Sequence, residues 1–87
     1  MKKTAKWQKG EYKKRRYLYK GEWRVAEGYE MDFLLDGRVQ ASFIAVPDFK
    51  AGVFHLRGMI RFKYAEYVPQ TRELPFGAED KSFEIDV

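Results

Sequence analysis

Apolar and polar residues alternate with a period of two through most of residues 15–66, and this alternation constrains the fold more than any other feature. Successive side chains of a β-strand point to opposite faces, so the alternation predicts strands with one buried face and one solvated face. Short segments that contain glycine interrupt the pattern and are typical of turns. We therefore predict five antiparallel strands, at residues 14–19, 22–35, 38–46, 53–66 and 82–87.

The segment Leu35-Asp36-Gly37 predicts how two of these strands pair. A three-residue loop needs a left-handed residue at its third position, and glycine adopts that conformation readily because it has no Cβ. This loop places Phe33 opposite Val39, with large apolar groups on one face. A two-residue turn would place Phe33 opposite Gln40 and mix the faces, so the three-residue loop is the prediction.

The segment Tyr19-Lys20-Gly21 predicts a second three-residue loop, which places Tyr17 opposite Trp23. Residues 22–34 then form one long strand that bends at Gly28, because a glycine within a strand often marks a bend or a bulge. The apolar residues that share a face along the strands are expected to form the core: Trp23, Phe33, Phe43, Leu56, Ile60, Phe62 and Ile85.

A chain of 87 residues is long enough for a single domain only, and its 45% hydrophobic and 17% aromatic content can supply a dense core. A meander with long bent strands closes most readily into a small barrel or a strongly coiled sheet. We expect one all-β domain over residues 1–87, an antiparallel meander of about five strands in a closed or nearly closed barrel. A basic N-terminal arm at residues 1–12 precedes a β body at 13–87, which contains a long loop at about 67–80.

Charge is distributed unevenly along the chain. Residues 1–24 contain ten lysines and arginines and two acids, whereas residues 25–87 contain seven bases and eleven acids, within an overall net charge of +4. A basic arm on a mildly acidic body binds polyanions by neutralising phosphates. Aromatic residues between the cations, Trp7, Tyr12 and Tyr17, suit base stacking. The alternative is a poorly ordered terminus that serves solubility.

A second basic row is predicted on one strand, where Arg57, Arg61 and Lys63 recur at even spacing. Their separation along a strand approximates the phosphate repeat of an extended nucleic acid. The alternative is an edge strand that its charges protect from aggregation. Acidic residues and a histidine share this predicted face. Metal-independent RNA cleavage needs a general base, a general acid and an arginine that stabilises the charge on phosphorus. The residues concerned are Glu30, Asp32, His55 and Arg57, and a solvated face with cross-strand ion pairs explains them as well.

Several classes of function are disfavoured by what the sequence lacks. Cysteine is absent, which excludes a disulfide scaffold, a Cys-ligated zinc site and thiol catalysis. The single histidine makes a two-histidine metal site impossible, and the isolated glycines form no phosphate-cradling motif. No apolar run is long enough to span a bilayer or to act as a signal peptide. We expect no metal, no cofactor, no membrane partner and a cytoplasmic location.

The leading functional hypothesis is a small non-enzymatic domain that binds RNA or DNA. The first alternative is a small accessory or inhibitor protein, of the kind that phages encode, that docks on a larger protein. Its basic arm would then contact an acidic surface of that larger protein. The second alternative is a small metal-independent ribonuclease. The sequence leaves the oligomeric state open, and edge-strand dimerisation is compatible with each hypothesis. The residues expected to contact nucleic acid are Lys2, Lys3, Lys6, Trp7, Lys9, Lys13, Lys14, Arg15, Arg16, Arg57, Arg61 and Lys63.

Overall fold

The computed structural model describes residues 1–62 and 71–86, with residues 58–62 described by their backbone. Within these described residues, six strands and one short 3-10 helix follow each other. They are β1 (Lys2–Tyr19), β2 (Glu22–Leu35), β3 (Arg38–Asp48), β4 (Val53–Phe62), β5 (Glu73–Pro75), η2 (Ala78–Asp80) and β6 (Ser82–Asp86).

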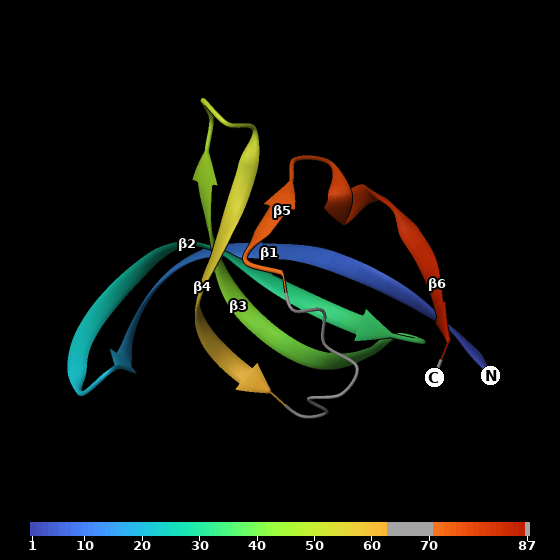
Figure 1. Cartoon of the computed structure of the whole chain (residues 1–87), viewed down its shortest axis with the longest axis horizontal. Helices are drawn as coiled ribbons and strands as arrows, with labels where there is room; N and C mark the ends of the chain where they lie inside the picture. The colour runs from blue at the N-terminus through green and yellow to red at the C-terminus, as the bar shows by residue number, and fades with distance from the viewer. Residues whose placement is uncertain (63–70, 87) are drawn as a thin grey trace.

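The strands form one antiparallel sheet in the order β5-β4-β3-β2-β1-β6. The sheet is strongly curled into a half-barrel, and both termini lie at the same end of it (Figure 1). The expected all-β meander in a nearly closed barrel is therefore confirmed, with six strands rather than five. The sixth strand is β5, which lies in the segment predicted as a loop at 67–80. The remainder of that loop up to residue 70, and residues 63–66 of the predicted fourth strand, lie outside the described residues.

The predicted N-terminal arm is the first half of β1 rather than a segment that precedes the sheet. Residues 2–6 pair with β6, and residues 5–9 pair with the end of β2. Ala5 and Trp7 are buried in the core, which explains why these residues form a strand. The Asp36 side chain accepts a hydrogen bond from the Thr4 amide at 2.9 Å, and this contact ties the strand to the β2–β3 turn.

Both predicted three-residue loops are two-residue turns. Lys20 and Gly21 have φ values of 49° and 77°, and Asp36 and Gly37 have φ values of 48° and 78°. Two positive φ values in succession define a type I′ turn, whose twist matches that of the flanking strands. Tyr17 therefore lies opposite Arg24, not opposite Trp23.

A bulge in β3 explains why the two-residue turn at Asp36-Gly37 does not mix the faces. Leu34 pairs with Val39 and Phe33 pairs with Ala41, so Gln40 is an extra residue without a partner on β2. The Gln40 side chain is buried and donates a hydrogen bond to the carbonyl oxygen of Arg38 at 3.0 Å. The bulge shifts the register by one residue and returns the apolar side chains of β3 to the face of Phe33.

The core lies on one face of the curled sheet, around Met31 and Phe33. Among the predicted core residues, Phe33 and Leu56 are buried, whereas Phe43 and Ile85 are half-buried and pack against the core. Trp23 is 64% exposed, so its prediction as a core residue is wrong. The side chains of Ile60 and Phe62 lie outside the described residues.

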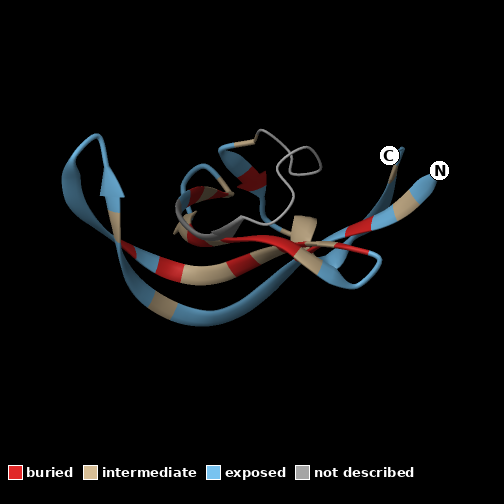
Figure 2. Cartoon of the chain, turned by 90° about the horizontal axis from the view of Figure 1, so that it is seen from below, coloured by how far each residue is buried: buried red, intermediate tan, exposed pale blue. Residues whose placement is uncertain are grey.

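Residues 12–28 form a two-stranded extension of the sheet, which we call the ribbon. In the register, β3 pairs with β2 only from Tyr29 onward, and β6 pairs with β1 only up to Lys6. The turn end of the ribbon is exposed and extends beyond the core (Figure 2). Residues directly opposite in an antiparallel pair share a face, so Tyr17 and Arg24 lie on one face of the ribbon, and Leu18 and Trp23 lie on the other.

Candidate nucleic-acid interface

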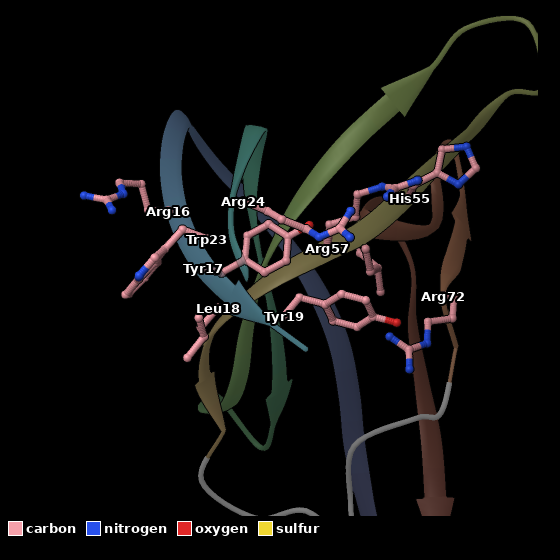
Figure 3. A pocket seen from close by; sticks show the side chains of 10 residues that line it. Arg16, Tyr17, Leu18, Tyr19, Trp23, Arg24, His55, Arg57 and Arg72 are labelled. Carbon is pink, nitrogen blue, oxygen red and sulfur yellow. The ribbon is translucent and has the colours of Figure 1, made fainter. Parts of the chain in front are cut away.

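The ribbon curves over β4 and encloses an open cleft of about 730 Å³. One wall comes from the ribbon, and the opposite wall comes from β4 and the residue before β5 (Figure 3). We call this site the arginine cleft. Its lining residues are Arg16, Tyr17, Leu18, Tyr19, Trp23, Arg24, His55, Leu56, Arg57 and Arg72.

The ribbon places its aromatic and basic side chains on two faces. Tyr17, Tyr19 and Arg24 point toward β4, whereas Arg16, Leu18 and Trp23 point away from it (Figure 3). We call the first face concave and the second face convex. On the concave face, the Arg24 guanidinium lies 5.1 Å from the centre of the Tyr19 ring.

Arginine–aromatic stacking occurs on both faces of the ribbon, since the guanidinium of Arg16 lies 4.8 Å from the centre of the convex Trp23 ring. Such stacking orders a long cationic side chain without neutralising it. The charges of these two arginines therefore stay available to an anion. Arg24 also forms an exposed ion pair with Glu22 at 3.5 Å, which is worth little in water.

The opposite wall is held by the ladder between β3 and β4. His55 pairs with Val46 and Arg57 pairs with Ile44, so both project from the same face of β4. Arg72 is fixed beside them because its carbonyl oxygen accepts a hydrogen bond from the Leu56 amide at 2.9 Å. The buried Leu56 contributes apolar surface to the cleft.

His55 is held between two carboxylates at the rim of the cleft. Its Nε2 atom lies 3.1 Å from Asp48, and its Nδ1 atom lies 3.8 Å from Glu73. The hydrogen bond from His55, together with one from the Ala51 amide, lowers the pKa of Asp48 below its ordinary value. Because Asp48 precedes the β3–β4 turn and Glu73 begins β5, His55 links three elements of this wall.

The charge of the cleft follows from its composition. Among the residues that the structure describes, its lining includes four arginines, one histidine and three aromatic residues, and no carboxylate. Arginine presents a planar fork of donors that matches the geometry of a phosphate, and the aromatic rings offer π-faces to nucleobases. The site is therefore chemically suited to a ligand that combines phosphate groups with planar rings.

Among the predicted contact residues whose side chains the structure describes, Arg16 and Arg57 belong to the lining of the cleft. Trp7 is 3% exposed, so it cannot stack on a base, and its prediction as a contact residue is wrong. Lys13 forms an ion pair with Glu30, and Lys2 forms one with Glu84 at 3.7 Å.

The other predicted contact residues lie elsewhere on the sheet. Lys9 lies 4.7 Å from the centre of the Tyr29 ring. Lys3 is half-buried, whereas Lys6, Lys14 and Arg15 are exposed along β1. Arg61 lies in β4 with its side chain outside the described residues, which also exclude Lys63.

Four basic or aromatic residues of the cleft were not predicted from the sequence: Tyr19, Trp23, Arg24 and Arg72. The alternation of Arg24 with Trp23 and Val25 was a visible signal, since a basic residue between apolar ones predicts a solvated face. That pattern gives the face of Arg24 but not its partner across the cleft. No local signal at Arg72 connects it with β4, because the contact depends on the pairing of β5.

The residues considered for RNA cleavage share one face of the sheet, as predicted. Glu30, Ile44 and Arg57 form a row across three strands, so Glu30 and Arg57 share a face at two strand spacings, roughly 10 Å. Glu30 contacts Lys13, whereas His55 contacts Asp48. The described residues contain no group of three or more acidic or histidine side chains that could hold a metal ion.

Within the described part of the chain, no helix is long and apolar enough to cross a membrane. Comparisons with protein families, curated proteins and solved structures found no match to this chain.

Proposed function

We propose that this domain binds nucleic acid and that the arginine cleft is the main contact surface. The observation that carries the proposal is the convergence of Arg24, Arg57 and Arg72 on a cleft whose described lining includes aromatic rings and no carboxylate, with Arg16 lining it from the convex face of the ribbon. Arg24 comes from the ribbon, and Arg57 and Arg72 come from the opposite wall, so a ligand between the walls would meet positive charge on both sides.

The energetic argument rests on the phosphate backbone, which dominates the affinity of most nucleic-acid-binding proteins. An arginine that donates to a phosphate forms a charge-assisted hydrogen bond, and such bonds are about twice as strong as neutral ones. The rings of Tyr17 and Tyr19 point into the same space and add stacking surface, which tolerates any base sequence. The proposal is therefore a binding module with weak sequence preference.

The test is a fluorescence-anisotropy titration of a labelled oligonucleotide at about 50 mM salt, where phosphate contacts are strong. Replacing Arg57 and Arg72 with alanine is expected to weaken binding by at least about tenfold, since each removes hydrogen bonds to a charged group. The matched control is Arg38→Ala. Arg38 is exposed and lies beside the β2–β3 turn, at the end of β2 remote from the ribbon turn.

Unchanged affinity in the double variant, with the control also unchanged, would remove the cleft from the proposal. Absence of binding by the full chain at low salt would remove nucleic-acid binding altogether. The same samples, incubated with bulk RNA in the presence of a chelator, test the ribonuclease alternative. Degradation that His55→Ala abolishes would favour that alternative over a binding module.

A second candidate function, docking on a larger protein, is favoured by an exposed aromatic pair at the β3–β4 turn. Phe49 is 82% exposed, and its ring lies 5.8 Å from that of Phe76. Exposed aromatic residues of this kind often anchor protein interfaces. A pull-down that returns one stoichiometric protein, and that Phe49→Ser abolishes, would support this function.

A further inference from the structure

The convex face of the ribbon exposes apolar side chains that the fold leaves uncovered. Leu18 and Trp23 lie directly opposite each other, and Val25 follows on the same face. All three are more than half exposed, with Trp23 at 64%. They form a contiguous cross-strand patch on the ribbon, rather than the single scattered apolar residues that are normal on a protein surface.

This patch is continuous with the arginine cleft. Arg16, Leu18 and Trp23 point away from β4 but still belong to the lining of the cleft. The cleft is therefore lined from both faces of the ribbon, whose outer edge is the edge of β1 that faces away from β2. In the described part of the chain, β1 has no hydrogen-bonded neighbour on that edge beyond Lys6, so the path around it is not blocked by another strand.

We propose that a single-stranded nucleic acid follows this path, with one base stacked on Trp23 on the convex face and its neighbours in the arginine cleft. The inference rests on the proposed function and extends it, because it names the strandedness of the ligand and a second base subsite. Stacking on Trp23 needs an unpaired base with a free face, which a duplex does not offer within its stack.

Arg16 makes the patch suited to a nucleotide rather than to a purely apolar partner. Its guanidinium lies 4.8 Å from the Trp23 ring, so a base on the free part of the ring would have a phosphate partner beside it. The neighbouring ribbon residue Lys14 is also basic and exposed, on the same face as Arg16 and opposite Glu27. Two copies of this chain stacked through their convex faces would bring these cations together, whereas a polyanion neutralises them.

The two tryptophans of the chain make the inference directly measurable, because only one of them can report on the patch. Trp7 is 3% exposed in the core, and Trp23 is on the convex face. We would titrate the full chain with unlabelled oligothymidylates of two to eight nucleotides and record the tryptophan emission. We expect quenching that grows with length, because a longer strand can reach from the cleft to Trp23.

The matched variants are Trp23→Leu and Trp23→Phe. Trp23→Leu keeps apolar bulk but removes the ring, and it is expected to abolish the quenching and to weaken single-strand binding by about five- to 150-fold. Trp23→Phe keeps a smaller ring and should retain a larger share of the affinity. Binding to a blunt duplex should be the same for wild type and Trp23→Leu, since no duplex base reaches the ring.

The outcomes separate this inference from the proposed function. Binding that requires Arg57 but leaves the emission and the Trp23→Leu affinity unchanged would overturn the inference and keep the proposed function. Tryptophan emission that changes with protein concentration in the absence of oligonucleotide would show that the convex patch contacts a second copy of the chain. That result would overturn the inference. An absence of oligonucleotide binding by anisotropy would overturn both.

Discussion

At the scale of single residues, Gly28 shows how a backbone approach can require the absence of a side chain. A Cβ added at Gly28 would overlap the backbone carbonyl of Ala45 in β3, at the point where the ribbon leaves the sheet. Gly28→Ala is therefore expected to destabilise the protein by about 1–3 kcal/mol, because the backbones must separate. A urea melt measures this difference.

The matched control for this prediction is Gly10→Ala. A Cβ at Gly10 would lie 3.6 Å from the nearest atoms of Glu30, which is ordinary van der Waals contact. Its effect on the free energy of unfolding should be within about 1 kcal/mol, the intrinsic difference between glycine and alanine. Equal stabilities for wild type and Gly28→Ala would contradict the close approach of β2 and β3 at this residue.

Asp48 shows how one carboxylate makes the stability of the cleft wall depend on pH. Its pKa in the folded protein is lowered from the ordinary 3.8, first by the hydrogen bond from His55 and then by the Ala51 amide. A carboxylate with a lowered pKa stabilises the folded protein at pH values above its ordinary pKa. This contribution is lost as the pH falls through the lowered pKa. We therefore expect the stabilisation by Asp48 to be lost below about pH 4.

Asp48→Asn is the variant that tests this dependence, because asparagine keeps an oxygen for the Ala51 amide and loses the charge beside His55. We expect the variant to be less stable than wild type at pH 7, and we expect the gap to close below about pH 4. Thermal melts between pH 3 and 7 measure both. A gap that stays constant over this range would show that the charge of Asp48 is not involved.

At the scale of elements, β1 combines a structural half and an exposed half in one strand. Its N-terminal half places Ala5 and Trp7 in the core and pairs with both β2 and β6. Deletion of residues 1–10 should abolish the folded state. Loss of a buried tryptophan side chain alone costs about 3–5 kcal/mol, and domains of this size have only a few kcal/mol of stability beyond that.

The matched control separates charge from structure in this segment. Replacing Lys2, Lys3, Lys6 and Lys9 with glutamine keeps the backbone pairing and both core residues, so the far-UV circular dichroism and the cooperative melt should survive. A deletion variant that still melts cooperatively near the wild-type midpoint would mean that the N-terminal half of β1 is dispensable for the fold.

The strands themselves could be predicted from the alternation, whereas their registers could not. The predicted register depended on counting from the turn, and each turn is one residue shorter than expected because Lys20 and Asp36 adopt positive φ values. The bulge at Gln40 then adds a residue that no local pattern marks. The side-chain parity of Phe33 and Ala41 still held, because burial of one face decides which residues share it.

The site was predictable only in part for a related reason. Trp23 shares its face with the core residue Met31, as the alternation predicted, but the ribbon extends beyond the elements that cover that face. The odd or even position of a residue in a strand gives the face on which its side chain lies, but it does not show whether other elements cover that face. In the N-terminal segment, the four lysines favour the prediction of an exposed arm, although Ala5 and Trp7 alternate with polar residues as they would in a strand.

At the scale of the whole molecule, folding redistributes a charge asymmetry that is extreme along the sequence. The basic N-terminal segment lies in β1, where Lys2 meets Glu84 of β6 and Lys13 meets Glu30 of β2. The arginine cleft, in contrast, combines cations from both halves of the chain, and its described lining contains no carboxylate. The phosphate contacts should therefore depend on the cleft more than on the first ten residues.

The salt dependence of binding tests this distribution. Each phosphate contact to a single strand contributes about −0.7 to the slope of log K against log salt, so four arginines give a slope near −3. Replacing Arg57 and Arg72 with glutamine should flatten the slope by about 1.4, in titrations between about 50 and 200 mM salt. The variant with four glutamines in residues 1–10 should retain most of the slope, because Lys2 already faces Glu84 and the four lysines are not among the lining residues of the cleft. The reverse result is a flat slope in the four-glutamine variant and an unchanged slope in the variant without the two arginines. It would place the bound nucleic acid along the N-terminal half of β1.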